Sequence, residues 1–179
     1  MKILVVVDMQ KDFINGSLGS KEALEIVPKV VEKINNYNGI VIATRDTHPD
    51  NYLETSEGKK LPVIHCVENT PGWEINSDVT MALENNVLFS GVINKPTFGS
   101  LELVDFVSTM IQEYGEKNIE EIELIGLCTD ICVISNALLL KANFYEIPIS
   151  IDSTCCAGVT PVSHEEALRT ASMCQINIK

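Results

Sequence analysis

The sequence predicts an α/β fold, with a parallel sheet that carries helices on both faces. Short apolar runs rich in β-branched residues alternate along the chain with segments whose apolar residues recur at helical spacing. The runs lack the polar alternation of a half-exposed strand, which is typical of strands covered on both faces. Right-handed crossovers between such strands build a three-layer, doubly wound sheet of about six strands, mainly parallel.

The first strands and the first helix are expected before residue 44. Ile3–Val7 is a continuous apolar run that ends at Asp8, and residues 9–19 are expected to form a loop. Apolar residues recur at helical spacing over Ala23–Ile34, which predicts an amphipathic helix. The next apolar run, Ile40–Ala43, predicts the second strand.

A long polar segment follows the second strand. It runs from Arg45 to about Ser77, has no regular apolar pattern and contains prolines at positions 49, 62 and 71. A loop of this length inside a compact domain is usually functional. We therefore expect this segment to contribute to a binding site.

Further strands and their connecting helices are expected after this segment. The strands are predicted at Val87–Ile93, Ile122–Ile125, Ile147–Ile151 and Ile176–Ile178. The helices are predicted to begin at Gly99, at about Asp130, and at Thr160 with Pro161 as the first helical residue.

Length, composition and charge limit the classes of protein that the chain could represent. With 179 residues and 45% hydrophobic content, residues 1–179 are expected to form a single domain. The 25 acidic residues outnumber the 13 basic ones and give a formal net charge of −12, which argues against nucleic acid and anionic membranes as partners. No apolar run is long enough for a signal peptide or a membrane span, so a cytoplasmic protein with reduced cysteines is expected.

The stretch Glu123–Val133 contains the strongest candidate for a reactive side chain. Its apolar run breaks at Gly126 and resumes in a helical pattern, and this junction is the carboxyl end of a strand, where α/β proteins bind ligands. Cys132 would lie in the first turn of the helix, where unpaired backbone N–H groups and the helix dipole favour the thiolate. The alternative is a buried structural cysteine, the commoner role of this residue type.

Two charged residues follow other predicted strands and could assist such a nucleophile. Asp8 ends the first strand and Lys95 follows the third, so parallel strands would bring both to the same sheet edge as Cys132. A nucleophilic cysteine needs a base to take its proton, and a nearby cation stabilises its thiolate. Asp8 could supply the base and Lys95 the cation, although each residue alone could equally be a strand-end cap or a surface side chain.

The long polar segment carries a candidate metal site. Asp46 and His48, followed by His65, offer a carboxylate and two imidazoles, a ligand set suited to zinc, iron or manganese. The alternative for Asp46 and His48 is a turn with local hydrogen bonds between side chain and backbone. His164, the third histidine of the chain, lies at the start of the last predicted helix.

Four motifs spread over most of the chain resemble the isochorismatase-like cysteine hydrolase superfamily, and most closely its nicotinamidase/pyrazinamidase branch. They are Val7–Phe13, Thr44–His48, Asn94–Phe98 and Gly126–Val133. The resemblance implies a catalytic triad of Asp8, Lys95 and Cys132. It also implies hydrolysis of nicotinamide to nicotinate and ammonia through a thioester on the cysteine, and a homo-oligomer, since relatives are often dimers or larger.

The resemblance further implies how the substrate would be held. Phe13 would form one wall of the pocket, and Cys128 and Thr129 would contact the substrate near the nucleophile. A cis peptide bond just before Thr129 would help to aim backbone N–H groups at the oxyanion of the reaction.

The same resemblance implies a bound divalent metal, with zinc expected and iron or manganese as alternatives. Asp46, His48 and His65 would bind the metal, which would hold the ring nitrogen of a pyridine amide. Relatives often complete the ligand set with a third histidine, and this chain has none between His48 and His65. Glu57 is the expected fourth ligand, with Glu54 as the alternative.

One departure from the nicotinamidase pattern leaves the substrate open. Nicotinamidases usually carry an aromatic residue shortly before the last metal-binding histidine, and Leu61–Ile64 contain none. Another small amide, ureido or carbamoyl compound is the alternative substrate, and a non-catalytic metabolite-binding protein is the alternative from another class. Hydrolysis of a vinyl ether, as in isochorismatases, is disfavoured because that branch lacks the nucleophilic cysteine.

Overall fold

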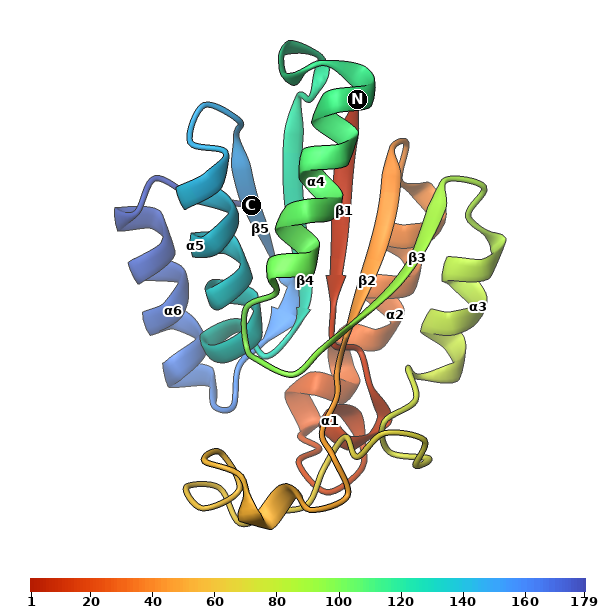
Figure 1. Cartoon of the computed structure of the whole chain (residues 1–179), viewed down its shortest axis with the longest axis vertical. Helices are drawn as coiled ribbons and strands as arrows, with labels where there is room; N and C mark the ends of the chain where they lie inside the picture. The colour runs from red at the N-terminus through yellow and green to blue at the C-terminus, as the bar shows by residue number, and fades with distance from the viewer.

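Six parallel strands form one sheet in the computed structural model, which describes residues 1–179 (Figure 1). They are β1 (Lys2–Val7), β2 (Ile40–Asp46), β3 (Phe89–Lys95), β4 (Glu121–Leu127), β5 (Ile149–Ala157) and β6 (Asn177–Ile178). Their order is β3-β2-β1-β4-β5-β6, so the chain fills one half of the sheet before it crosses to the other. The predicted doubly wound α/β fold is confirmed, and every strand pair is parallel.

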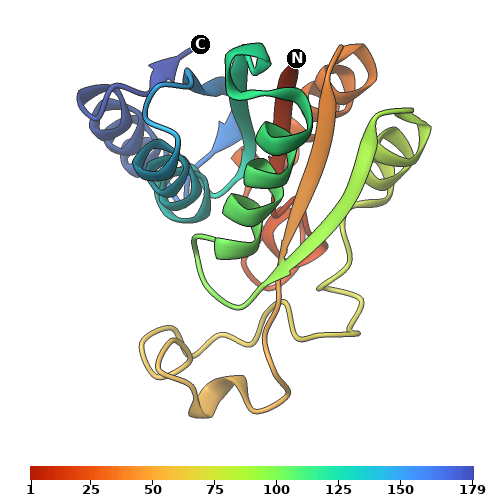
Figure 2. The same cartoon turned by 45° about the horizontal axis from the view of Figure 1, so that its top comes forward.

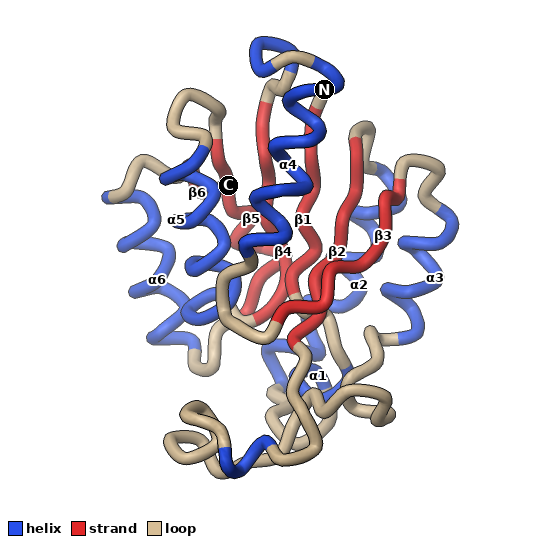
Figure 3. Tube along the Cα trace, in the orientation of Figure 1, coloured by secondary structure: helices blue, strands red, loops and turns tan.

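Helices cover both faces of this sheet. They are α1 (Lys11–Ile14), α2 (Lys21–Asn36), α3 (Ser77–Asn85), α4 (Leu101–Tyr114), α5 (Ile134–Asn143) and α6 (Pro161–Met173). Figures 1 and 3 show α4, α5 and α6 on one face and α2 and α3 on the other. Neighbouring strand residues point to opposite faces, so Ile3 packs into the apolar core on the α4 side and Leu4 into the core on the α2 side. None of the helices combines the length and apolar character needed to cross a bilayer.

Side-chain caps fix the start of several helices. The hydroxyls of Ser20 and Ser100 each accept a hydrogen bond from a backbone N–H in the first turn of α2 and α4. Thr160 caps α6 and Pro161 is the first residue of that helix, as predicted. A cap of this kind pairs an N–H group that the helix itself leaves unpaired and is worth about 1 kcal/mol.

Several predicted boundaries differ from the structure. β3 begins at Phe89 and not at Val87, and residues 9–19 contain the short helix α1. Helix α3 follows the long polar segment, where no helix was predicted. β5 extends to Ala157 because a bulge shifts its register against β4 after Ile151, so the strand is longer than its apolar run.

The carboxyl ends of four neighbouring strands carry the predicted functional residues. Lys95 and Asp46 are the last residues of β3 and β2, Asp8 follows β1, and Cys132 lies shortly after β4. The loop between β2 and α3 extends beyond this edge of the sheet (Figure 2). The topology therefore gathers residues from distant parts of the sequence at one end of the molecule.

Candidate active site

The turn that carries Cys132 begins where β4 passes very close to β1. Gly126 has a φ of +114°, and a Cβ atom there would lie 2.1 Å from the carbonyl oxygen of Val7, so only glycine fits. The Leu127–Cys128 peptide bond that follows is cis. The cis bond was expected one position later, just before Thr129, and that prediction was wrong because a non-proline cis bond has no sequence signal of its own.

Residues Thr129–Val133, which we name the Cys132 turn, form one turn of π-helix before α5. The carbonyl oxygen of Cys128 accepts hydrogen bonds from the backbone N–H groups of Ile131 and Val133. The N–H group of Cys128 itself donates to no acceptor in the protein. Single π-turns inside helices are frequent at functional sites, and this one leaves a backbone donor free beside the nucleophile candidate.

The three predicted triad side chains lie together at the sheet edge. Nζ of Lys95 lies 2.7 Å from Oδ2 of Asp8 and 3.4 Å from Sγ of Cys132. The exposed fractions of Asp8, Lys95 and Cys132 are 0%, 1% and 4%. Lys95 therefore places a positive charge beside a carboxylate and a thiol that are almost completely buried.

Asp8 is held in a backbone conformation that few residues adopt. Its φ is +45°, and its N–H group donates to the carbonyl oxygen of Thr44 at 3.2 Å. The Thr44 hydroxyl donates to Oδ1 of Asp8 at 2.7 Å. Oδ2 contacts Lys95 but accepts no well-aligned hydrogen bond, which leaves it able to take a proton from a neighbouring group.

Burial dominates the acid–base properties of this group. It raises the pKa of the Cys132 thiol well above its ordinary value, and the Asp8 carboxylate raises that pKa further, against the effect of Lys95. Burial also raises the pKa of Asp8 despite the adjacent Lys95. Burial therefore opposes the thiolate that the start of the helix was expected to favour, because loss of hydration disfavours a charged group. A base beside Cys132 would offset this effect by taking the thiol proton.

Asn136 of α5 connects the segments that carry Lys95 and Cys132. Its buried side chain donates to the carbonyl oxygens of Phe98 at 3.0 Å and Cys132 at 2.8 Å, and accepts from the N–H of Ser100 at 2.9 Å. The role of this residue could not be predicted from the sequence, because a single asparagine within a helical pattern does not reveal its partners. The link holds the β3–α4 loop against the Cys132 turn.

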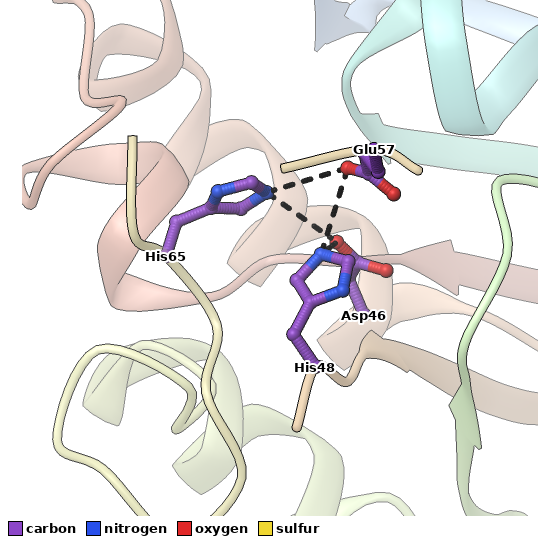
Figure 4. A group of neighbouring side chains, drawn as sticks. All are labelled: Asp46, His48, Glu57 and His65. Carbon is purple, nitrogen blue, oxygen red and sulfur yellow. Dashed lines mark ion pairs between the residues drawn. The ribbon is translucent and has the colours of Figure 1, made fainter. Parts of the chain in front are cut away.

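Asp46, His48, Glu57 and His65 form a second group of side chains (Figure 4). One ligand atom from each lies within 4.8 Å of all the others. Nε2 of His48 lies 3.0 Å from Asp46 and 3.6 Å from Glu57, and Nε2 of His65 lies 3.8 Å from each carboxylate. The alternative residue Glu54 accepts a hydrogen bond from Asn51 instead and lies outside this cluster.

The cluster fits a divalent metal ion. A metal bonded to each ligand at roughly 2 Å needs ligand atoms about 3–4 Å apart, close to the separations found here. Nε2 of His48 is buried without a hydrogen-bond partner. Nδ1 of His65 lies 2.8 Å from the carbonyl oxygen of Val63, so Nδ1 carries the proton and Nε2 presents its lone pair to the cluster.

Gln10 fixes the end of β2, where Asp46 lies. Its amide accepts from the N–H of Asp46 at 2.8 Å and donates to the carbonyl oxygens of Asp46 at 2.8 Å and Trp73 at 2.9 Å. Oδ1 of Asp46 lies 3.6 Å from Nζ of Lys95, so this carboxylate joins the two groups of side chains. Burial alone would raise the pKa of Asp46, but the neighbouring His48 ring and the charge of Lys95 hold it below its ordinary value.

Comparison with known protein families identifies the family of this chain. The family model described as "Isochorismatase domain" matches residues 2–178 of the chain. The chain belongs to the isochorismatase family.

Similar members of the isochorismatase family include proteins named for an activity. The nicotinamidase/pyrazinamidase of Mycobacterium tuberculosis is 27% identical over 184 residues, which cover 97% of each chain. The nicotinamidase of Schizosaccharomyces pombe is 30% identical over 202 residues, covering 93% of this chain and 87% of that protein. The crystal structure of the pyrazinamidase of Pyrococcus horikoshii in complex with zinc is 27% identical, with a TM-score of 0.79 over 99% of this chain and 98% of that one.

In this member of the isochorismatase family, the two groups of side chains face one cavity. It has a volume of about 780 Å³, and its lining includes Cys132, Asp46, Glu57 and His65. Its apolar lining includes Phe13, Leu18, Leu61, Phe98, Ile131 and Val159. A larger, more open hollow of about 1010 Å³ lies at the amino ends of the strands and contains none of the predicted site residues. The smaller cavity is therefore the candidate active site.

Two of the three residues predicted to contact the substrate line the cavity, and the third does not. Phe13 and Cys128 line the cavity, and the Phe13 ring centre lies 5.6 Å from that of His65. Thr129 does not line the cavity, and its hydroxyl lies 2.8 Å from Nδ1 of His164. Phe98 was not predicted, because its side chain reaches the cavity only through the path of the loop after β3.

Proposed function

We propose that the protein hydrolyses nicotinamide to nicotinate and ammonia, with Cys132 as the nucleophile. The observation that carries the proposal is one cavity in which a buried Asp8–Lys95–Cys132 group faces a cluster suited to a metal. The similarity to proteins named nicotinamidase or pyrazinamidase, over most of their length, supports the same reaction class, hydrolysis of the C–N bond of a linear amide.

In the first half of the reaction, the substrate becomes attached to Cys132. Asp8 takes the thiol proton, Lys95 stabilises the thiolate, and the sulfur attacks the amide carbonyl. The free N–H group of Cys128 is the candidate donor to the oxyanion, and such a donor contributes roughly 3 kcal/mol in other systems. Asp8 then gives its proton to the departing nitrogen, ammonia leaves, and a thioester remains.

In the second half, water releases the product. Asp8 takes a proton from water, the resulting hydroxide attacks the thioester carbonyl, and Cys132 leaves as a thiolate that regains its proton from Asp8. The pKa of Asp8, raised by burial, suits these transfers, because a base accepts a proton more readily as its pKa approaches that of the donor.

We propose that Asp46, His48, Glu57 and His65 bind zinc. The zinc complex of a similar pyrazinamidase supports this metal, and the donor set of two imidazoles and two carboxylates also suits iron or manganese. When bound, the metal would act as a Lewis acid that holds the ring nitrogen of the substrate.

We also propose that the protein is a cytoplasmic homo-oligomer without nucleic-acid or membrane partners. The net charge of −12 supports the absence of both partners, since each attracts basic surfaces.

A second candidate is hydrolysis of a non-aromatic amide, ureido or carbamoyl compound. The aliphatic Leu61 lines the cavity shortly before His65, and this favours a substrate without an aromatic ring. Phe13 and Phe98 still offer aromatic faces, which favours nicotinamide. A non-catalytic protein is disfavoured by the fully buried Asp8–Lys95 ion pair. Such a pair rarely repays the free energy of removing its charges from water, so a role other than stabilising the fold explains it better.

Ammonia release from nicotinamide by the purified protein tests the proposal. We expect turnover that a chelator abolishes and added zinc restores. Cys132→Ala should remove turnover without changing the circular dichroism spectrum. Cys174→Ala, at an exposed cysteine, should leave turnover unchanged. Absence of release by the zinc-loaded protein would overturn nicotinamide as the substrate, and turnover by Cys132→Ala would overturn the nucleophile.

A further inference from the structure

The Cys132 turn is attached to α6 by side chains that the proposed reaction does not use. Oγ1 of Thr129 lies 2.8 Å from Nδ1 of His164, near the start of α6. Thr129 is only 1% exposed. The carboxylate of Asp130 accepts hydrogen bonds from the backbone N–H of Val159 at 3.1 and 3.2 Å. Two adjacent residues of the turn are therefore tied to neighbouring parts of the chain, Thr129 to the first turn of α6 and Asp130 to the segment between β5 and α6.

That segment also forms part of the cavity wall. Gly158 and Val159 line the cavity. A Cβ atom at Gly158 would lie 2.9 Å from the backbone nitrogen of His164, so the start of α6 packs directly against the wall. Thr160 and Ser163 cap each other's backbone and fix the first turn of the helix. The imidazole therefore has a defined position relative to both the wall and the Cys132 turn.

Thr129 lies between the two groups that most need accurate placement. It follows Cys128, whose N–H group is free, and it begins the turn that presents Cys132. Both cysteines line the cavity, whereas Thr129 and His164 do not. A displacement of Thr129 would therefore move the nucleophile and the oxyanion donor without removing a contact to the substrate.

We propose that His164 is a positioning residue for the proposed amide hydrolysis. Its hydrogen bond to the Thr129 hydroxyl holds the Cys132 turn in the orientation that attack on the carbonyl requires. Imidazole and hydroxyl can each donate or accept, so the neutral ring is sufficient and no proton is transferred through it. The inference rests on the proposed function, because it assigns His164 to the same nucleophile.

Substitutions that keep or remove this hydrogen bond test the role. Asparagine can place a polar atom close to the position of Nδ1, whereas glutamine places one near Nε2. We expect His164→Ala and His164→Gln to lower kcat roughly 10- to 100-fold with KM changed less than about threefold, since misplaced reacting groups slow the chemical step and the pocket stays intact. His164→Asn should retain most of kcat, and Glu165→Ala, at an exposed neighbour, should be unchanged.

The partner residue supplies a matched pair of variants. Thr129→Val keeps the shape of the side chain and removes its hydroxyl, so it should reproduce the loss in His164→Ala, whereas Thr129→Ser should keep activity. The double variant His164→Ala/Thr129→Val should lose no more than either single one, because both remove the same interaction. The two Thr129 variants test the role of the hydrogen bond even if His164→Ala fails to fold.

The alkylation rate of Cys132 by iodoacetamide reports on the turn without any substrate. We expect faster alkylation in His164→Ala and Thr129→Val and a wild-type rate in His164→Asn, because a displaced thiol is less affected by the burial and the Asp8 carboxylate that disfavour its thiolate. If nicotinamide is not hydrolysed, this rate still tests the positioning role, so the two proposals fail separately. Wild-type kcat and alkylation in His164→Ala, or fully additive losses in the double variant, would overturn the inference.

Discussion

The side chains of Asp8 and Cys132 both favour their uncharged forms more strongly in this protein than in water, because both are buried. The charge of Lys95 opposes this effect at both groups. Groups that interact this strongly titrate together, so a pH profile reports the behaviour of the whole triad. The acid limb of that profile nevertheless has a predictable position.

We expect kcat/KM to fall on the acid side with an apparent pKa above 3.8, the ordinary value of an aspartate. Asp8 must be unprotonated to take the thiol proton, and burial raises the pKa at which it becomes so. Thr44→Val should move the limb to still higher pH, because the lost hydroxyl stabilises the charged carboxylate. Measurements of kcat/KM against pH, with the exposed Thr109→Val as control, check this, and an acid limb at or below 3.8 would contradict it.

Residues of the candidate site could be predicted from the sequence when their position depends only on where a strand ends. Asp8, Asp46 and Lys95 lie at or directly after the ends of their strands, so a parallel sheet brings them together whatever the details of packing. The protonation state of Cys132 could not be predicted in this way. The helix dipole is a local property, whereas burial depends on segments from the whole chain.

At the level of elements, Asn136 of α5 holds together the two segments that carry Lys95 and Cys132. We expect Asn136→Ala to lower the free energy of unfolding by about 2–4 kcal/mol, because it removes three hydrogen bonds, of which those to Ser100 and Cys132 are buried and that to Phe98 is partly buried. Asn143→Ala, on the same helix, removes an exposed hydrogen bond to Leu139 and is the matched control. Urea unfolding followed by circular dichroism checks both, and equal stability of the two variants would contradict the linking role.

Two elements show why some boundaries could not be predicted. Val79, Ala82 and Leu83 of α3 have helical spacing, but the helix is short and follows a long polar segment that hides its start. β5 continues through polar residues because a bulge lets it rejoin β4, with Gly126 opposite Cys156. A bulge depends on the partner strand, so the apolar run alone gives only the first part of β5.

At the scale of the whole molecule, one ion-pair network joins α2 to the sheet. Nζ of Lys33 lies 2.8 Å from the buried carboxylate of Glu123 and 2.9 Å from that of Asp152, and Lys179 lies 3.1 Å from Glu123. The network therefore connects α2, β4, β5 and the residue after β6. It lies at the hollow near the amino ends of the strands and was not predicted, because its members are far apart in the sequence.

We expect Lys33→Met to destabilise the protein by about 1–3 kcal/mol, below the loss for an isolated buried pair because Lys179 still faces Glu123. Lys21→Met removes an exposed pair with Glu25 on the same helix and should change stability by less than about 0.5 kcal/mol. Thermal and urea unfolding of both variants check this. If Lys33→Met lost no more stability than Lys21→Met, the ion-pair network would not stabilise the packing of α2 on the sheet.

The strand order also sets which residues are neighbours in the site. β1 lies between β2 and β4, so Asp8, directly after β1, lies between Asp46 at the end of β2 and the turn after β4 that carries Cys132. In the proposed reaction, a substrate that reaches from the proposed metal ligands to the nucleophile must therefore pass over the end of the central strand, next to the proposed base. Movement of β2 or β4 relative to β1 would change the length that the substrate has to span.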